Sequence, residues 1–349
     1  MKRTTTKRLA AEIMFVVGIG MLTACSSSGS SGSASSSGSS GLASSSGSSG
    51  TSVPTVDILN LANVPALTDI VDGITSGLKA EYGANGIKID SEDANGDVGV
   101  AQTIASQFVG DKPDVIATVA TASLQAVLNK TKTIPVMFAA VSDPVTAGAV
   151  KSLNGSTGTN VSGIYNVNPI GDVLDLTKEM VPNNNKVGIL YNPGESNSVT
   201  AMKLAIADAE ARHMVIVKAP VNSSNDVESG AQSLIGKVGS IIVIDDTTVV
   251  TGQAGVFQVA RAAHIPVFTT VEDSVTAGAI VGVGASAKAT GEELAQMIIK
   301  ELKGTKPGDI PLQPEPKADL FVNKTAASAT GFTIPASVLS RATVVTDGK

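Results

Sequence analysis

Two hydroxyl residues that could bind a charged group follow the apolar segment 115–120. Thr121 and Ser123 stand where this segment, a predicted strand, gives way to a predicted helix. The first turn of a helix offers free backbone N–H groups and the positive end of a dipole, and hydroxyls beside it suit a carboxylate or phosphate. Ser and Thr are also favoured as helix caps. Both roles therefore remain open for this pair.

The loop 191–198 carries more polar groups than a turn requires. A Pro-Gly pair accounts for the turn, whereas Asn192, Glu195 and Asn197 add one acid and two amides at the end of a predicted strand. These side chains could contact a polar ligand.

Adjacent carboxylates follow the wholly apolar segment 241–244. Asp245 or Asp246 could bind an ammonium group through charge-assisted hydrogen bonds. Alternatively, Asp246 or Thr247 could be the N-cap of the next helix. Further candidates for ligand contact are Asn63, Asp143, Thr247 and Glu272.

No group of residues predicts an enzyme or a metal site. The Gly-x-Ser-x-Gly patterns lie only in the Ser/Gly-rich stretch 26–52, and Gly282-x-Gly284 lacks the third glycine of a dinucleotide-binding loop. The two histidines, His213 and His264, stand apart from each other and from other candidate ligands. We therefore expect no catalytic residue, no cofactor and no metal.

The chain contains an internal repeat. Residues 134–149 return, with one residue fewer, as residues 265–279, and both copies begin with Ile-Pro-Val and end with Val-Thr-Ala-Gly-Ala. Each copy starts with an apolar run typical of a buried parallel strand and continues into a polar loop with an acid. Ligands of open α/β sheets bind beyond the carboxyl ends of the strands. We therefore expect two similar lobes that present the loops of Asp143 and Asp273 to one cleft.

Short apolar segments alternate with amphipathic segments along the rest of the chain. This alternation predicts an α/β fold of parallel sheets with right-handed crossovers and helices on both faces. The predicted strands are 56–61, 87–90, 115–120, 136–140, 186–191, 215–217, 241–244, 267–269, 279–283 and 320–323, and the predicted helices are 70–82, 98–108, 123–129, 198–212 and 286–302.

The first 52 residues are expected to lie outside the fold. Residues 1–25 carry four basic residues, a short apolar run and the ending Leu-Thr-Ala-Cys25, which together are typical of an export signal. Cys25 is the only cysteine in the chain, so disulfides are excluded. Residues 26–52 are almost entirely Ser and Gly and predict a random coil that reaches ~25–30 Å on average.

The charge balance argues against nucleic acid or an anionic membrane surface as the partner. Without the four basic residues and Glu12 of the signal, 21 Lys and Arg stand against 30 Asp and Glu, a net charge of −9. Binding to phosphate-rich surfaces requires clustered positive charge. We expect a small-molecule ligand instead.

Several motifs together resemble one bacterial family. The ending at Cys25 resembles a lipobox, whose cysteine becomes the lipidated first residue. Over nearly all of 54–345 the chain resembles the substrate-binding lipoproteins of ABC importers, and most closely the tryptophan/tyrosine type. The motifs are Ala120-Thr-Ala-Ser-Leu-Gln125, Ile134-Pro-Val with Ser142-Asp-Pro144, Val161-Ser-Gly163, Val187-Gly-Ile-Leu-Tyr-Asn-Pro-Gly-Glu-Ser-Asn-Ser198, Asp245-Asp-Thr247 and Gly331-Phe-Thr-Ile-Pro335.

The resemblance implies the type I periplasmic-binding-protein fold, with two Rossmann-like lobes joined by a three-crossover hinge. One lobe would hold residues 54–165 and 278–318, and the other 166–277 and 319–345. The family often has Asp-Asn-Thr where this chain has Asp245-Asp246-Thr247.

We therefore expect a monomeric, non-enzymatic receptor that is lipid-anchored outside the cell through Cys25. It would capture a small polar ligand, an amino acid that is possibly aromatic, and deliver it to a permease and its ATPase. Thr121 and Ser123 would bind the ligand carboxylate, and Asp245, Asp246 or Glu195 its ammonium group. Two alternatives remain, an extracellular sensor that presents its closed form to a membrane kinase and a surface hydrolase, although the sequence offers no nucleophile and base for the latter.

Overall fold

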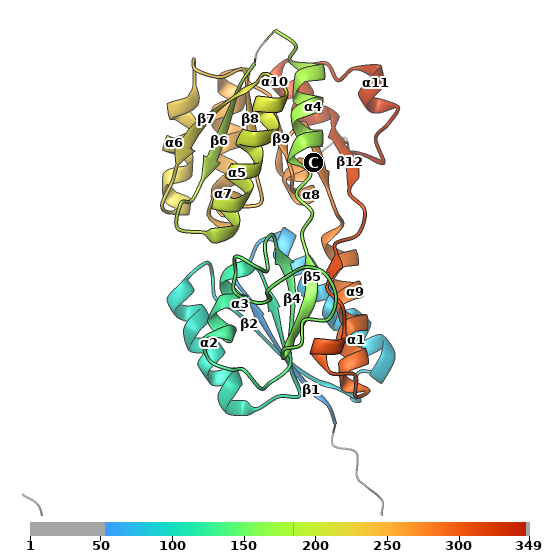
Figure 1. Cartoon of the computed structure of the whole chain (residues 1–349). Coiled ribbons are helices and arrows are strands. Elements are labelled where there is room, and N and C mark those ends of the chain that lie inside the picture. Colours follow the sequence, from blue (N-terminus) through green and yellow to red (C-terminus); the bar gives the residue numbers. More distant parts are fainter. Residues whose placement is uncertain (1–52, 184, 347–349) are drawn as a thin grey trace, which may run out of the picture. The chain divides into compact units, whose positions relative to one another are not determined.

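The computed structural model describes residues 53–183 and 185–346. These residues form two sheets of mostly parallel strands, each covered by helices (Figure 1). This arrangement confirms the predicted fold class. The signal, the Ser/Gly-rich stretch and Cys25 lie outside the described residues. Among the described helices, none combines the length and apolar character needed to cross a bilayer.

The strands and helices alternate along most of the chain. The strands are β1 (Thr55–Asn60), β2 (Lys88–Asp93), β3 (Val115–Val119), β4 (Val136–Val141), β5 (Val161–Tyr165), β6 (Lys186–Tyr191), β7 (Val215–Pro220), β8 (Ser240–Val243), β9 (Val267–Thr269), β10 (Val281–Gly284), β11 (Gln313–Pro314), β12 (Asp319–Asn323) and β13 (Val344–Thr346). The helices are α1 (Pro65–Tyr82), α2 (Val98–Asp111), α3 (Thr121–Leu128), α4 (Ile170–Met180), α5 (Ser196–Ala211), α6 (Val227–Leu234), α7 (Thr247–Ala262), α8 (Glu272–Ala277), α9 (Ala287–Leu302), α10 (Lys324–Thr330) and α11 (Ala336–Leu339), with short 3-10 turns at Ser224–Asp226 and Pro307–Asp309.

The first sheet has the strand order β11-β5-β4-β3-β1-β2, and all its strand pairs are parallel. Strand β3 is buried throughout and β1 is buried after its first residue, as expected for strands that are covered on both faces. Helices α1 and α9 pack together, as do α2 and α3 (Figure 1).

The second sheet has the order β13-β12-β10-β9-β8-β6-β7 and is parallel except for the antiparallel pair β10–β12. The repeat gives each sheet an inner strand, because β4 lies between β3 and β5 while β9 lies between β8 and β10. The expected boundary at residue 278 was wrong for β10. This strand belongs to the second sheet because it pairs with β9 and β12.

Three short segments connect the two sheets. The chain passes from β5 to α4 through residues 166–169, from β10 to α9 through residues 285–286, and from β11 to β12 through residues 315–318. Any relative movement of the sheets therefore has to be absorbed in these few residues.

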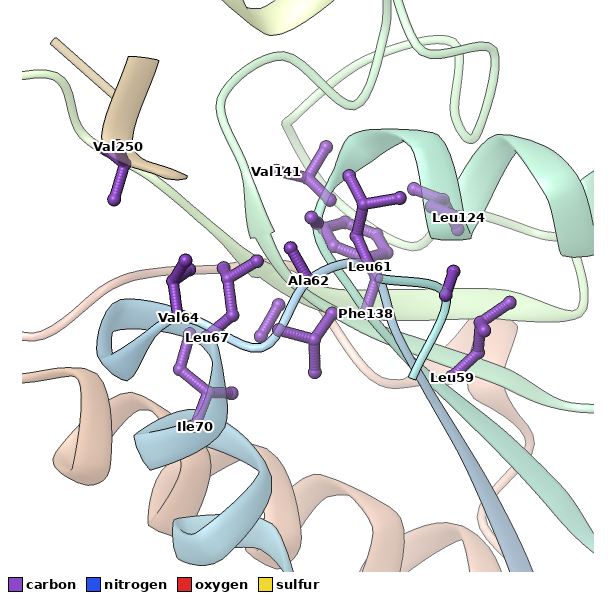
Figure 2. Close-up of a cluster of buried hydrophobic side chains, with 14 of the residues drawn as sticks. Leu59, Leu61, Ala62, Val64, Leu67, Ile70, Leu124, Phe138, Val141 and Val250 are labelled. Carbon is purple, nitrogen blue, oxygen red and sulfur yellow. The ribbon is translucent and has the colours of Figure 1, made fainter. Parts of the chain in front are cut away.

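Buried apolar side chains lie at the carboxyl end of the first sheet and continue toward the second. Figure 2 shows Val64 and Leu67 at the start of α1, with Val250 of α7 pointing toward them. These three residues are at least nine-tenths buried. Where the start of α1 faces α7, the surfaces between the two sheets are therefore apolar.

Two element ends differ from the sequence predictions for local reasons. Helix α1 begins five residues before the predicted start, because Pro65 occupies its first turn, where a fixed φ and a missing N–H are tolerated. Strand β2 continues to Asp93, three residues beyond the predicted end. It is an edge strand whose residues are all partly or fully exposed, so its polar second half lacks the apolar signal of a strand.

The contact between α1 and α9 depends on glycines. A Cβ atom at Gly291 would lie 2.1 Å from the Ile70 carbonyl oxygen, and one at Gly73 would lie 2.4 Å from the Lys288 carbonyl oxygen. These distances are far below contact distance, so any side chain there would force the helices apart.

We expect Gly291→Ala to lower the free energy of unfolding by about 1–3 kcal/mol or more, because neither backbone can yield without separating the helices. Gly110→Ala is the matched control, since Gly110 is also helical but has open space around its Cβ position. The control should be neutral or slightly stabilising, as alanine favours helix. Urea unfolding of both variants measures the difference, and equal stabilities would refute the close-packing argument.

Candidate functional site

A cavity lies where the segments that connect the sheets meet the carboxyl ends of strands from both sheets. Its free volume is about 80 Å³. One part of its wall is apolar and includes three residues from the first turns of α1, and the other part is polar and strongly acidic. The apolar residues include Ala66, Leu67, Ile70, Ala140, Val167 and Val271, and the polar ones include Ser142, Asn166, Asp245, Thr270, Glu272, Asp273 and Glu315.

Asp245 is the predicted residue that lies most centrally in this arrangement. Its carboxylate accepts hydrogen bonds from Asn166 Nδ2 at 2.7 Å and Ser142 Oγ at 3.2 Å. Ser142 follows β4 of the first sheet and Asn166 lies in a connecting segment, so Asp245 links the second sheet to both. Burial raises the pKa of Asp245, and the two hydrogen bonds oppose this shift without cancelling it. Both of these partners are neutral, so the carboxylate can still accept a cation.

Asp246, the next residue, has its carboxylate turned into the protein. It is fully buried and caps α7 by accepting from the Val249 N–H at 2.8 Å. Its other oxygen accepts from the Asn192 N–H at 2.6 Å and from Ser198 Oγ at 2.5 Å. Burial and then the charge of Glu195 raise the pKa of Asp246 to about 6. The N-cap alternative is therefore the one that the structure shows.

Glu195 also holds the start of α7. Its carboxylate accepts from the backbone N–H groups of Thr247 and Thr248, both at 3.0 Å, and from Thr248 Oγ1 at 2.6 Å. A carboxylate at a helix N-terminus satisfies free N–H groups and interacts favourably with the dipole.

The two amides of the same loop contribute to this arrangement. Asn192 Nδ2 donates to Thr248 Oγ1 at 2.8 Å, and Asn197 Nδ2 donates to the Asp245 carbonyl oxygen at 3.1 Å. The loop that the sequence marked as rich in polar groups thus positions α7 and the backbone of Asp245. The Asp245 side chain, in contrast, lines the cavity.

Thr121 and Ser123 begin α3, as predicted. Both residues are buried, and their hydroxyls have no hydrogen-bond partner among the protein atoms. They are not cavity-lining residues, but β3 and β4 are parallel neighbours with Val119 opposite Ala139. Thr121 and Ser142 therefore leave the same edge of the first sheet. A contact with a ligand by this pair stays a prediction.

The remaining candidates occupy different positions. Asn63 is exposed after β1, outside the cavity lining. Asp143 forms a turn by accepting from the N–H groups of Val145 and Thr146, both at 3.0 Å, and from the Thr146 hydroxyl. Burial tends to raise the pKa of Asp143, but these hydrogen bonds outweigh it and lower the value. Glu272 lines the cavity at the start of α8.

Several polar cavity residues were not among the predicted contact residues, including Ser142, Asn166, Thr270 and Glu315. Ser142 and Thr270 directly follow β4 and β9, the repeated strands, so their position at a strand end was a usable signal. Glu315 lies between prolines in a connecting segment, where local sequence gives no sign of a ligand site.

The acids of the cavity are harder to ionise than exposed acids. Burial, opposed by the Val167 N–H and reinforced by Asp245, raises the pKa of Glu315 to about 8. Burial and then Asp69 raise the pKa of Asp273 to about 6. Burial and then Asp273 raise the pKa of Glu272. Within the described parts of the chain, no group of three or more His, Cys, Asp and Glu is arranged to hold a metal ion.

The raised pKa values predict that the protein loses stability as pH rises. Asp57, Asp246 and Asp273 have folded pKa values of about 6, Glu301 of about 7 and Glu315 of about 8. Unfolded carboxyls titrate near pH ~4, so between ~4 and ~8 the folded state binds more protons and its stability falls with rising pH.

Urea unfolding should therefore show a higher midpoint at pH 5 than at pH 8. Asp143, Asp175 and Glu179 have lowered pKa values and act in the opposite sense, but only below their ordinary values near pH ~4. A midpoint that stays constant or rises between pH 5 and pH 8 would contradict this prediction.

Comparisons with known proteins agree on one family. The family model described as ABC transporter substrate binding protein matches residues 55–346. A tyrosine-binding protein of Clostridioides difficile is 32% identical over 325 residues, which cover 93% of this chain and 92% of that protein.

Two solved structures are similar throughout the described part of the chain. A conserved domain protein from Vibrio cholerae has a TM-score of 0.82 at 36% identity, and an ABC domain from Streptococcus pneumonia in complex with L-Trp has a TM-score of 0.81 at 31% identity. Each match covers 84% of this chain and 100% of the solved chain. More distant structures, at 12% and 13% identity, share the type I periplasmic-binding-protein fold alone. The chain belongs to the ABC transporter substrate-binding protein family, whose members bind solutes and are not enzymes.

Proposed function

We propose that this protein captures an amino acid with an aromatic side chain outside the cytoplasm and delivers it to an ABC permease for import. One observation carries the proposal: the Asp245 carboxylate and an apolar wall from α1 line the same cavity. A carboxylate suits an ammonium group, and apolar side chains such as Leu67 and Ile70 suit an aromatic ring.

The relatives support this ligand class. The C. difficile relative is named for tyrosine binding, and the structure from S. pneumonia holds L-Trp. Both are more than 30% identical to this chain. We infer from these two proteins that the ligand of this protein is also an aromatic amino acid.

The ligand would contact both sheets. Its ammonium group would bind Asp245, and its carboxylate would bind the free hydroxyls of Thr121 and Ser123 at the start of α3. Two buried hydroxyls without protein partners at a helix N-terminus suit an anionic group.

Ligand binding would close two lobes around the cavity. We assign residues 54–165 and 285–314 to one lobe and 166–284 and 315–346 to the other, following the strands of the two sheets. The ligand stabilises the closed state only through contacts that it makes better there. A change from almost fully open to almost fully closed requires about 5.5 kcal/mol of differential binding.

Delivery would take place at the membrane. Lipidation of Cys25 would anchor the protein, and the Ser/Gly-rich residues 26–52 would let a monomeric binding domain move above its permease and ATPase. Metabolic labelling with a lipid analogue tests the anchor, since Cys25→Ala would abolish labelling of a lipoprotein.

A thermal-shift screen followed by calorimetry tests the ligand class. The screen should cover aromatic, aliphatic and charged amino acids together with 3-indolepropionate, which is tryptophan without its ammonium group. We expect L-tryptophan or L-tyrosine to raise the melting temperature most, because a ligand that binds the folded state stabilises it. Strong stabilisation by a sugar or nucleoside and none by an amino acid would overturn the proposal.

Asp245→Ala should weaken binding of the aromatic amino acid at least tenfold, because it removes a charge-assisted hydrogen bond worth about 1.5–3 kcal/mol. Its stability should change little, since Asn166 and Ser142 remain partly exposed to solvent in the cavity. Asp72→Ala is the control, because Asp72 is exposed on the same α1 helix that supplies the apolar wall. Equal dissociation constants for the two variants in calorimetry would remove Asp245 from the site.

A further inference from the structure

The cavity end at the connecting segments is lined by four carboxylates and no basic residue. Asp245 follows β8, Glu272 and Asp273 begin α8, and Glu315 comes from the segment between β11 and β12. Glu315 Oε1 accepts from the Val167 N–H at 2.8 Å, and the Glu315 N–H donates to the Tyr165 carbonyl oxygen at 2.9 Å. Glu315 is thus held in place by hydrogen bonds to another connecting segment.

Two polar atoms in this part of the cavity have no hydrogen-bond partner among the protein atoms. Thr270 is 8% exposed and lines the cavity, yet its hydroxyl has no hydrogen-bond partner among the protein atoms. Asp273 Oδ2 is also buried without a partner. Buried polar atoms are nearly always paired in folded proteins, so these two atoms can hydrogen-bond to a group that enters the cavity.

The charges that face these acids are also negative. Asp69 of α1 acts on Asp273 and Glu272, Asp319 of β12 acts on Glu272, and Glu195 acts on Asp245. The groups that favour their ionised forms are neutral donors: the Asn166 amide, the Ser142 hydroxyl and backbone N–H groups. Like charges in a partly buried site cannot all ionise, so at least one carboxyl keeps its proton.

Burial raises the pKa of both Asp245 and Glu315, that of Glu315 to about 8, and the charge of Asp245 adds to the shift of Glu315. We assign the proton to Glu315 because Asp245 accepts from two neutral donors that favour its ionised form, whereas Glu315 accepts from one. An ammonium group near Asp245 would bring positive charge into the same site. This charge would lower the pKa of Glu315 and favour its ionised form.

We propose that the acidic end of the cavity binds the ligand's ammonium group in exchange for a proton on Glu315, so that capture releases a proton and solutes without a cationic group are rejected. This inference rests on the proposed amino-acid ligand. The exchange balances in charge, because one cation enters the site, the Glu315 carboxyl becomes a carboxylate and its proton passes to solvent.

The exchange makes affinity depend on pH in one direction. At pH values well above 8 Glu315 is already ionised, so the ligand displaces no proton. Below that value the dissociation constant should rise by up to about tenfold for each pH unit, since each unit makes the proton tenfold harder to displace. A transient acidification outside the cell would therefore weaken capture.

Calorimetry at pH 6.5 in buffers of different ionisation enthalpy tests the exchange, with L-tryptophan and L-tyrosine as probes. We expect release of close to one proton per ligand by the native protein. Glu315→Gln should reduce release to near zero and flatten the pH dependence, while its amide oxygen can still accept from Val167. Glu301→Gln is the matched control, because Glu301 is a half-buried acid with a pKa of about 7 that does not line the cavity.

The control should release as many protons as the native protein. Tight binding without proton release, or equal release by Glu315→Gln and native protein, would overturn the exchange and leave the proposed ligand class intact. 3-Indolepropionate should bind at least tenfold more weakly than L-tryptophan at pH 6.5, and equal affinity would also overturn it.

A second measurement does not need a ligand. Infrared spectra of the ligand-free protein should contain a carboxylic-acid carbonyl band that disappears near pH 8, and the difference between native protein and Glu315→Gln isolates it. If this difference band is missing, Glu315 holds no proton and the exchange is refuted. If the band is present but no amino acid binds, the proposed ligand class fails, and with it the exchange for an amino-acid ammonium.

Discussion

The site depends on the hydrogen bonds that two carboxylates accept at the start of α7. Asp246 and Glu195 together satisfy the first backbone N–H groups of this helix, and they also tie the loop after β6 to the end of β8. With these two acids occupied, the neighbouring Asp245 carboxylate is directed to the cavity. A capped helix fixes the backbone of its first residues, and a ligand-binding side chain requires such a rigid support.

The acidic residues of the cavity lie where the chain connects its two sheets, and their mutual repulsion destabilises the folded state there. Four carboxylates without a basic neighbour oppose folding, whereas the apolar wall around Leu67 and the close α1–α9 contact favour it. Conflicts between local electrostatics and stability are expected at functional sites. Because Glu315 and Asn166 lie in the connecting segments themselves, any group bound between them also affects the residues that would bend.

Much of the fold could be predicted from the sequence. The repeat indicated two similar sheets because its two copies are buried inner strands, β4 and β9, whose apolar runs are their strongest signal. Polar edge strands such as β2 were only partly predicted. The assignment of β10 was wrong because its antiparallel pairing with β12 joins segments far apart in the chain, and no local pattern records such a partner.

The sequence by itself determined the α/β class, the absence of any disulfide and the strand-end loops that carry the polar residues. Only the tertiary structure decided which of these residues face the cavity. Asp245 and Asp246 are identical in type and adjacent, yet the carboxylate of one meets Asn166 and that of the other caps α7. The physical reason is that the direction and protonation of a carboxylate depend on donors and charges from other elements, here Ser142, Asn192 and Glu315, which only folding brings to it.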